Sequence, residues 1–301
     1  MNISIPADFG TRMSAFPGGA QWLTDLPDLA AACAERWSLK LQPPFPLSLN
    51  YVCPVQRSDG SIAVLKIGPA TPEFLCEQAA LRFYDGAGCA RLLEAAPELG
   101  ATLLERLAPG TMLSELADDE EATRIAASLM AELWRPAPAR EPFPSIEDWA
   151  RGLERLRTAF GGGTGPFSRE MVETAEALFA ELLPSQGERV LLHGDLHHFN
   201  ILQAKRDSWR AIDPKGLIGE REAELAPLLY NPDLETLDHP ALRRLTLRRI
   251  DQLAEFFGFD RRRVYAWAYA QSVLSSWWSC EDNDPEFSPA PRIAEVLADL
   301  I

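Results

Sequence analysis

The chain has 301 residues, of which 47% are hydrophobic and 24% charged, and its formal net charge is −15 at pH 7. This length corresponds to roughly two domains, and the composition is that of a globular protein whose core needs neither metals nor disulfides. The acidic balance argues against a nucleic-acid-binding protein, which needs a basic face. It suits a cationic or neutral small substrate, although acidity also serves solubility.

Three features lead us to expect a cytoplasmic protein without a membrane partner. The five cysteines include no C-x-x-C pair, and their odd number is typical of free thiols in a reducing compartment. The first residues, MNISIPADFG, contain neither the basic nor the apolar region of a signal peptide. No apolar run approaches the roughly 20 residues of a membrane span. The oligomeric state stays open.

Residues 1–107 predict a strand-rich N-terminal lobe, with an extra helical segment within residues 1–45. The Asp59-Gly60 pair is a hairpin turn signal. Thr71 as N-cap and Pro72 at the first helical position begin a helix that ends near residue 86 or 88. The other expected elements are a helix over 25–39 and strands over 47–56, 61–67, 91–95 and 101–106. Together they predict a small antiparallel sheet.

Residues 108–301 predict a helical C-terminal lobe with a small hairpin. The expected helices cover residues 111–134, 146–160, 168–183, 241–257, 260–280 and 290–300. An island of strand-like sequence lies between residues 190 and 214.

The most informative stretch is the string HGDLHHFNIL over residues 193–202, which follows an apolar run. Asp195 and Asn200 are five residues apart across a loop, and Asp213 lies thirteen residues beyond Asn200. Folding of the intervening hairpin brings Asn200 next to Asp213. These oxygen ligands suit Mg²⁺ that is held by a few protein groups plus substrate phosphates. Asp195 faces the same space and is placed to accept a hydroxyl proton.

This spacing, H-x-D-x-x-x-x-N followed by an Asp-led metal motif, resembles the phosphoryl-transfer site of kinases. The loop is similar to the catalytic loop of aminoglycoside phosphotransferases, in which glycine replaces the arginine of protein kinases. The longer string through residue 232 resembles the streptomycin 6-kinase and hydroxyurea phosphotransferase branch of that family. The resemblance implies a two-lobed, protein-kinase-like α+β fold, in which residues 1–107 grip the nucleotide and residues 108–301 contain the catalytic loop and the acceptor pocket. It also implies ATP and Mg²⁺ as cofactors and Asn200 and Asp213 as metal ligands.

The histidines of the loop suggest an alternative. His193, His197 and His198 are candidate zinc ligands, but zinc needs three or four ligands in one shell, and the one other histidine is His239. By resemblance, His193 organises the loop through hydrogen bonds to the backbone. His197 and His198 are then structural or lie behind the ligands.

Lys66 interrupts the apolar strand over 61–67, and a buried lysine is costly unless it meets an anion. The string V-L-K resembles the kinase lysine that binds the α- and β-phosphates. The alternative is an edge-strand lysine that reaches water. Glu77 and Glu73 lie on one face of the next helix, and we predict that Glu77 is the partner of Lys66, because its face packs against the sheet.

The remaining nucleotide contacts are less defined. No G-x-G-x-x-G phosphate loop occurs around residues 56–61, so Ser58 and the turn backbone are the candidates to cover the phosphates. By resemblance, the strand ending near residue 107 is the hinge, where backbone groups of Glu105 and Leu107 bind the adenine edge.

The helical lobe must supply the acceptor pocket. The candidates are Glu220, Glu222, Trp278, Glu281 and Asp282, with Asp284 in the same loop. Acidic residues at a helix C-terminus oppose its dipole, which favours a functional role for Glu281 and Asp282. The alternatives are a solvated loop for these acids and a core position for the tryptophan. A cationic aminoglycoside suits carboxylates beside aromatic faces, whereas hydroxyurea does not need them.

The sequence therefore predicts ATP-dependent phosphorylation of a hydroxyl group on a streptomycin-type aminoglycoside or on hydroxyurea, a reaction that confers antibiotic resistance. A housekeeping sugar or amino-alcohol kinase is the alternative within the same class. A nucleotide-binding pseudokinase and a metal-dependent hydrolase are the alternatives from other classes. The pseudokinase is disfavoured because Lys66, Asp195 and Asp213 are all present.

Overall fold

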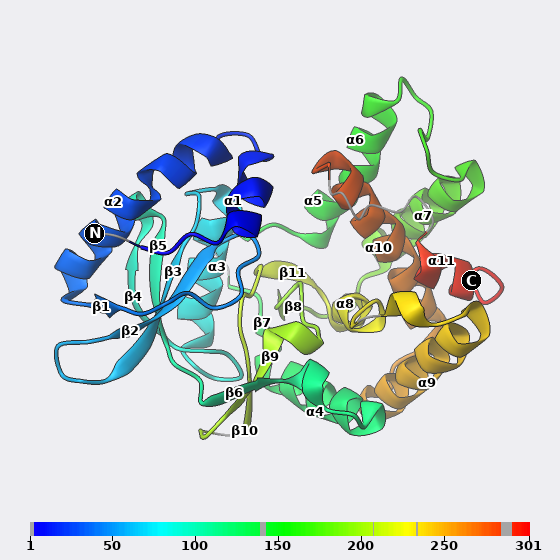
Figure 1. Ribbon diagram of the computed structural model, residues 1–301. Helices are drawn as coiled ribbons and strands as arrows, with labels where there is room; N and C mark the ends of the chain where they lie inside the picture. The colour runs from blue at the N-terminus through cyan, green and yellow to red at the C-terminus, as the bar shows by residue number, and fades with distance from the viewer. Residues whose placement is uncertain (1–2, 139–142, 207, 233, 284–290) are drawn as a thin grey trace. The chain divides into compact units, whose positions relative to one another are not determined.

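The computed structural model describes residues 3–138, 143–206, 208–232, 234–283 and 291–301. The chain forms two compact units, Met1–Gly110 with Gln203–Arg210 and Thr111–Leu202 with Ala211–Ile301 (Figure 1). The sequence analysis placed the hairpin tip 203–210 in the helical lobe. The tip belongs to the first unit because Arg206 donates hydrogen bonds to the Glu105 carboxylate (2.6 Å) and the Gly86 carbonyl (2.9 Å).

The first unit contains a five-stranded sheet in the order β1-β2-β3-β5-β4, with antiparallel neighbours. The elements are α1 (Ala7–Ser14), α2 (Gly19–Trp37), β1 (Lys40–Leu41), β2 (Tyr51–Gln56), β3 (Ile62–Ile67), α3 (Pro72–Tyr84), β4 (Leu92–Ala96) and β5 (Ala101–Glu105). The predicted sheet is confirmed, and Thr71 caps α3 by accepting a hydrogen bond from the Phe74 N–H (3.3 Å). Helix α1 was not predicted. Helix α2 begins at Gly19 rather than at residue 25, because Trp22 extends its buried face.

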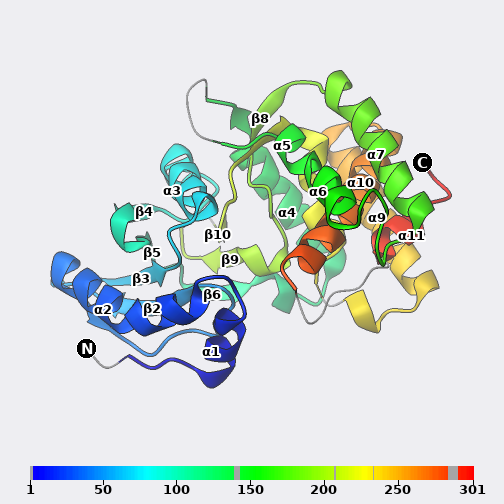
Figure 2. The same ribbon diagram turned by 90° about the horizontal axis from the view of Figure 1, so that it is seen from above.

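The alternation of β3 gives the two faces of this sheet different covers. Ala63, Leu65 and Ile67 are fully buried on the face that α1 and α2 cover, and α2 runs along the sheet (Figure 2). Lys66 lies on the other face. There the Gln78 side chain of α3 donates to the Thr102 hydroxyl of β5 (3.0 Å), so α3 packs on the face that contains Lys66.

The second unit is mainly helical. Its helices are α4 (Asp119–Leu133), α5 (Ile146–Ala150), α6 (Gly152–Ala159), α7 (Arg169–Leu182), α8 (Ala226–Leu229), α9 (His239–Phe257), α10 (Arg261–Glu281) and α11 (Arg292–Leu297). Helix α10 contacts α6, α7, α8, α9 and α11, and it is buried from Trp267 to Leu274. It is therefore the central helix of this unit.

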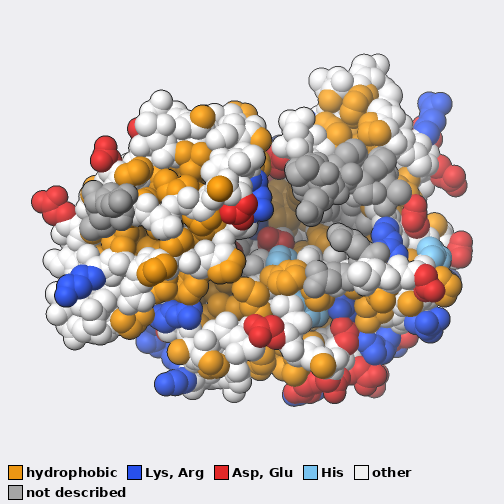
Figure 3. Space-filling view, viewed as in Figure 1, with side chains coloured by type: hydrophobic (Ala, Val, Ile, Leu, Met, Phe, Trp, Pro, Cys, Tyr) orange, Lys and Arg blue, Asp and Glu red, His pale blue; other side chains and the backbone are white. Residues whose placement is uncertain are grey.

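Two predicted helices have different bounds. The helix expected over 111–134 begins at Asp119, because the Asp118 carboxylate caps it by accepting hydrogen bonds from two backbone N–H groups. The helix expected over 146–160 is divided into α5 and α6. Acidic side chains gather over α4 in Figure 3, and the first turn of this helix contains three of them, where the helix dipole favours negative charge.

Two small sheets accompany these helices. One has the order β11-β8-β7, from β7 (Arg135–Pro136), β8 (Arg189–Leu192) and β11 (Leu217–Glu220). The other has the order β10-β9-β6, from β6 (Pro109–Met112), β9 (Ile201–Ala204) and β10 (Ser208–Ala211). Strands β8 and β9 flank the HGDLHHFN loop. Among the described residues, no helix combines the length and the apolar character that a bilayer span requires.

Candidate active site

The loop between β8 and β9 turns sharply at Gly194, immediately before Asp195. Gly194 has φ +83°, and an added Cβ would lie 3.1 Å from the Trp149 ring and 3.2 Å from the Leu217 and Lys215 side chains. A side chain at this position would therefore meet both backbone strain and close contacts. The glycine that replaces the arginine of protein kinases is required by the local packing.

His193 fixes the shape of this loop. Its ring is fully buried; Nδ1 accepts a hydrogen bond from the Asp195 N–H (3.2 Å), and Nε2 lies 2.9 Å from the Ile212 carbonyl. Because Nδ1 accepts, Nε2 carries the proton and donates it. Burial lowers the pKa of His193 to about 3, so the ring is neutral. The predicted hydrogen bonding of His193 to the backbone is confirmed.

Glu224 is a functional candidate that sequence reasoning missed. Its carboxylate is 1% exposed and accepts hydrogen bonds from the backbone N–H groups of His193 (2.6 Å) and Gly194 (2.9 Å). Burial raises its pKa to about 8. Glu224 therefore clamps the two residues that precede Asp195. The one sequence signal was a third glutamate, after Glu220 and Glu222, in the run that follows Asp213.

We expect Glu224 to make folding depend on pH. Since its pKa is raised from 4.5 to about 8, its neutral form is favoured in the folded state. The resulting stability is fully present below the unfolded pKa and is lost as the pH rises through about 8. The wild type should therefore lose stability relative to the variant Glu224→Gln as the pH rises. Its free energy of unfolding, measured against that of the variant, should fall by about 3 kcal/mol between about pH 5 and pH 8. Urea titrations check this, and parallel curves for the two proteins would contradict it.

Asp195 is only partly exposed; 33% of its side chain is accessible. Burial raises its pKa, and the neighbouring His197 and Lys215 offset part of that rise. His197 Nε2 lies 3.6 Å from the Asp195 carboxylate, and burial lowers the pKa of His197. The Asp195 carboxylate is therefore oriented by a fixed loop and reachable from solvent.

Asn200 and Asp213 meet as the hairpin spacing predicted. The Ile212 N–H donates to the Asn200 carbonyl (2.9 Å), which places Asp213 one residue beyond this pairing. The Asn200 side-chain nitrogen donates to the Asp195 carbonyl (2.9 Å), which holds the amide group beside Asp195. Asp213 has φ +59°, a left-handed backbone that aspartate tolerates better than most residues. Within the described residues, no three His, Cys, Asp or Glu side chains form a metal-binding group.

Lys66 and Glu77 form a buried ion pair in the first unit. Lys66 is 2% exposed, and its Nζ lies 2.8 Å from both Glu77 carboxylate oxygens. The predicted pairing is therefore confirmed, and Glu73 is not the partner. The contact of Lys66 with nucleotide phosphates stays a prediction.

Removal of this pair should separate folding from nucleotide binding. Glu77→Ala should lower the free energy of unfolding by about 3–5 kcal/mol, because it leaves the Lys66 charge buried without its carboxylate. The double variant Lys66→Met with Glu77→Leu should regain most of that stability but bind ATP at least about tenfold more weakly. Urea unfolding and ATP titration measure the two effects. Wild-type ATP affinity in the double variant would contradict the assignment of Lys66.

The predicted hinge residues, Glu105 and Leu107, differ in whether their backbone groups already form hydrogen bonds. The Glu105 N–H donates to the Arg91 carbonyl (2.9 Å), and the Glu105 carboxylate holds the Arg91 N–H and Arg206. Leu107 is buried, and within the described residues its N–H and C=O form no backbone hydrogen bond. Leu107 is thus the better candidate for adenine.

Ser58 lies exposed in the turn between β2 and β3. The Asp59 carboxylate shapes this turn by accepting hydrogen bonds from the Ser61 N–H (2.9 Å) and hydroxyl (2.6 Å). Gly60 supplies the positive φ that the turn requires. Contact of Ser58 with phosphate stays a prediction.

Two of the predicted acceptor residues have structural partners instead. Glu220 is buried, and its carboxylate binds the Arg263 guanidinium (2.6 and 2.9 Å) and the Trp267 indole N–H. It is a packing carboxylate, which corrects the prediction that it binds the acceptor. Glu281 forms a bidentate pair with Arg155 (2.8 and 2.9 Å), so its place at a helix C-terminus has a structural reason.

The other acceptor candidates stay untested. Glu222 is partly buried, which raises its pKa, and Asp282 is an exposed residue at the end of α10. Asp284 lies outside the described residues. Trp278 packs edge-on against Trp149, with ring centres 5.1 Å apart.

Two aromatic residues near Asp195 were missed by sequence reasoning. Trp149, on α5, contacts the backbone at Gly194 and is only partly buried. Burial raises the pKa of the Tyr230 phenol, and the nearby charge of the Asp195 carboxylate raises it further. Trp149 and Tyr230 therefore bring aromatic rings to the neighbourhood of Asp195, and Trp278 packs against Trp149.

Comparisons with known proteins agree with this geometry. Residues 42–283 match the family model described as aminoglycoside/hydroxyurea antibiotic resistance kinase. The chain is 34% identical to a streptomycin 6-kinase of Streptomyces griseus, over 99% of this chain and 98% of that protein. It is 35% identical to a hydroxyurea phosphotransferase of Kitasatospora aureofaciens, over 98% of this chain and 86% of that protein.

A solved structure shows the fold. A thermostable variant of the aminoglycoside phosphotransferase APH(4)-Ia, in a ternary complex with ADP and hygromycin B, superimposes with a TM-score of 0.64. The match covers 90% of this chain and 98% of that one at 13% identity. The predicted protein-kinase-like α+β fold is thereby confirmed.

Proposed function

Because this chain belongs to the aminoglycoside/hydroxyurea antibiotic resistance kinase family, we propose that it transfers the γ-phosphate of ATP to a hydroxyl group of a streptomycin-type aminoglycoside. Hydroxyurea is the second candidate acceptor, since a hydroxyurea phosphotransferase is as similar to this chain as a streptomycin kinase is. The chain is a phosphotransferase that acts on an alcohol group, and its relatives are antibiotic kinases.

One observation supports the proposal most strongly: Asp195, Asn200 and Asp213 lie together. Asp195 and Asn200 are on a loop that His193 and Glu224 hold in place, and Asp213 is next to it across the hairpin. Asp195 orients the acceptor hydroxyl and accepts its proton as the bond to phosphorus forms. Its partial exposure lets an acceptor reach it.

The donor set fits Mg²⁺. A carboxylate and an amide oxygen are hard ligands, and Mg²⁺ in kinases takes its other ligands from water and phosphates. The metal would neutralise charge on the phosphates when bound. Asn200 contributes an amide oriented by the Asp195 carbonyl, and Asp213 contributes a carboxylate from a backbone with positive φ. In this proposal Lys66, positioned by Glu77, binds the α- and β-phosphates of ATP.

The aromatic faces near Asp195 favour a cationic acceptor. A cation above a tryptophan ring gains electrostatic attraction, and the net charge of −15 attracts a polycation from a distance. With Glu220 and Glu281 occupied by arginines, Trp149 and Trp278 are the better candidates for acceptor contact.

An acceptor panel tests the proposal. The full chain is incubated with γ-labelled ATP and Mg²⁺ and with streptomycin, hydroxyurea, a neutral sugar or choline, and labelled products are separated from phosphate. We expect transfer to streptomycin or hydroxyurea and none to the sugar or choline. Transfer to the sugar or choline alone would favour a housekeeping kinase. Phosphate release that is equally fast without any acceptor would favour a hydrolase.

A further inference from the structure

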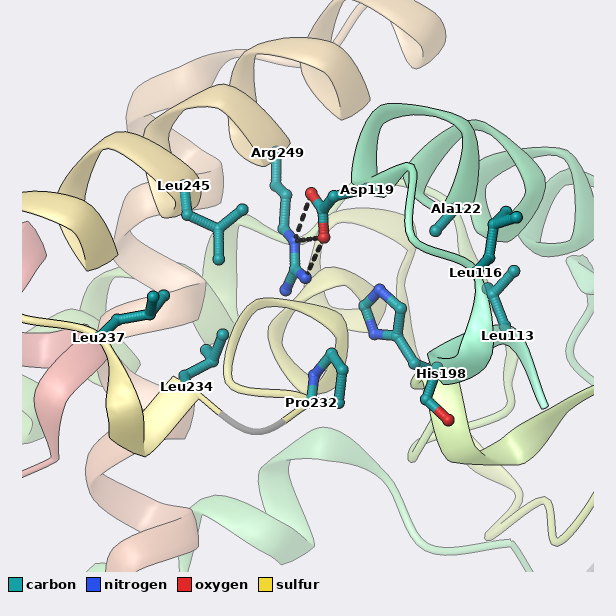
Figure 4. A pocket seen from close by; sticks show the side chains of 11 residues that line it. Leu113, Leu116, Asp119, Ala122, His198, Pro232, Leu234, Leu237, Leu245 and Arg249 are labelled. Atoms are coloured by element: carbon teal, nitrogen blue, oxygen red, sulfur yellow. Dashed lines mark hydrogen bonds and ion pairs between the residues drawn. The ribbon is translucent and has the colours of Figure 1, made fainter.

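A cavity of about 190 Å³ lies in the second unit, on the side of the catalytic loop where His198 points (Figure 4). None of the residues to which we assign phosphoryl transfer or acceptor binding lines it. Much of its wall is apolar, from the segment before α4, from Pro232, Leu234 and Leu237, and from α9. The leucines of this wall are Leu113, Leu116, Leu234, Leu237 and Leu245.

His198 is the polar group that sets this cavity apart. Its side chain is 2% exposed, and within the described residues neither ring nitrogen has a hydrogen-bond partner. Buried polar atoms in folded proteins nearly always have one. His193 and His197, in contrast, use their rings to hold the loop backbone. Figure 4 shows the His198 ring turned into the cavity, toward Arg249 and Asp119.

The charged groups of the wall neutralise each other. The Arg249 guanidinium binds the Asp119 carboxylate and also donates to the carbonyls of Leu228 (2.8 Å) and Asn231 (2.6 Å). Asp119 accepts a second ion pair from Arg248. An anion would therefore compete with Asp119 for Arg249. A cation would compete with Arg248 and Arg249 for Asp119. The charges of the described lining residues therefore balance, which favours an uncharged ligand.

We propose that this cavity binds a small uncharged molecule with an apolar body and one hydroxyl group, whose hydroxyl pairs with the buried His198 ring. A neutral imidazole presents one donor and one acceptor, and a hydroxyl group matches either nitrogen. A cavity of about 150 Å³ lined by apolar side chains holds benzene, so the space here accommodates a six-membered ring with a substituent.

The cavity lies beside the turn that carries Asn200, one of the proposed metal ligands. His198 begins the short 3₁₀ turn His198–Asn200, and Asn200 ends it. A ligand held by His198 therefore contacts the turn that presents Asn200. The inference does not depend on the identity of the acceptor, because the cavity residues and the acceptor candidates are different side chains.

Phenol and toluene are the matched probes, since they differ by a hydroxyl in place of a methyl group. Calorimetric titration of the full chain should give a saturable phenol affinity about three- to tenfold higher than that for toluene, the usual effect of one hydrogen bond. Saturating ATP or streptomycin should not displace phenol, because neither occupies the cavity. His198→Leu should remove the preference for phenol and keep the affinity for toluene.

A second variant places the site and covers the case in which His198→Leu does not fold. Leu245→Trp fills the cavity from α9 and keeps His198, so it should abolish binding of both probes while circular dichroism stays native. Equal affinity of the wild type for phenol and toluene would overturn the proposal. So would the absence of saturable phenol binding, displacement of phenol by ATP or streptomycin, or unchanged phenol binding in either folded variant.

Discussion

Asp195→Asn is expected to lower kcat by roughly 10²–10⁴-fold, the usual range for a positioned general base, while ATP still binds. The asparagine keeps the shape of the side chain and removes the group that accepts the proton of the hydroxyl. The loop itself should survive, because its hydrogen bonds come from the Asp195 backbone N–H and C=O, which bind His193 and Asn200. Fold and nucleotide affinity are therefore separable from chemistry in this variant.

The measurement is single-turnover transfer of labelled phosphate to an acceptor identified in the panel, beside a titration with a non-hydrolysable ATP analogue. Glu176→Gln is a matched control, since it neutralises another carboxylate of the same unit that is 35% exposed and has no role in the proposed site. We expect a change in the transfer rate for Asp195→Asn and none in the affinity for the analogue. Near wild-type turnover would remove Asp195 from the mechanism.

The features of the site that the sequence predicted correctly depend on short-range geometry. Alternation along β3 put Lys66 on the face opposite the main core, and the helix start at Thr71 put Glu77 on the side that meets it. The pairing of Asn200 with Asp213 followed from the length of one hairpin. Each of these relations spans fewer than about 15 residues, within which strand and helix periods keep their phase.

The features that were missed or wrong depend on packing between distant segments. Glu220 meets Arg263 and Trp267, which are 43 and 47 residues away, and Glu281 meets Arg155 at a separation of 126 residues. Local rules assign a charge at a helix end to solvent or to a ligand. They cannot show that an arginine from another helix arrives there.

Glu224 and Trp149 illustrate the same limit at the catalytic loop. Glu224 reaches back about 30 residues to bind the His193 and Gly194 amides, and Trp149 approaches Gly194 from α5. A buried carboxylate without a nearby cation is costly, so sequence alone places such a glutamate on the surface. The resemblance pointed to Gly194, but not to the physical reason for a glycine there, which includes the close approach of the Trp149 ring.

The metal assignment of Asp213 has the second large expected effect, and two variants separate charge from backbone. Asp213→Ala removes the carboxylate and places alanine at φ +59°, which costs about 1–2 kcal/mol. Asp213→Asn also removes the charge, but asparagine tolerates the left-handed conformation. The alanine variant should therefore lose thermal stability that the asparagine variant keeps.

Both variants should bind Mg·ATP at least about tenfold more weakly than the wild type, a change of about 1.4 kcal/mol. Without metal, all three proteins should bind ATP alike, because Lys66 and Glu77 are unaltered. Titrations with ATP, once with Mg²⁺ and once with a chelator, compare each of the two variants with the wild type under both conditions. If Mg²⁺ strengthens ATP binding to Asp213→Asn as much as to the wild type, the carboxylate is not a metal ligand, and the positive φ at this position serves only to turn the chain after β10. If the strengthening is lost in the asparagine variant while its melting temperature is unchanged, charge is the cause, since the backbone has been kept.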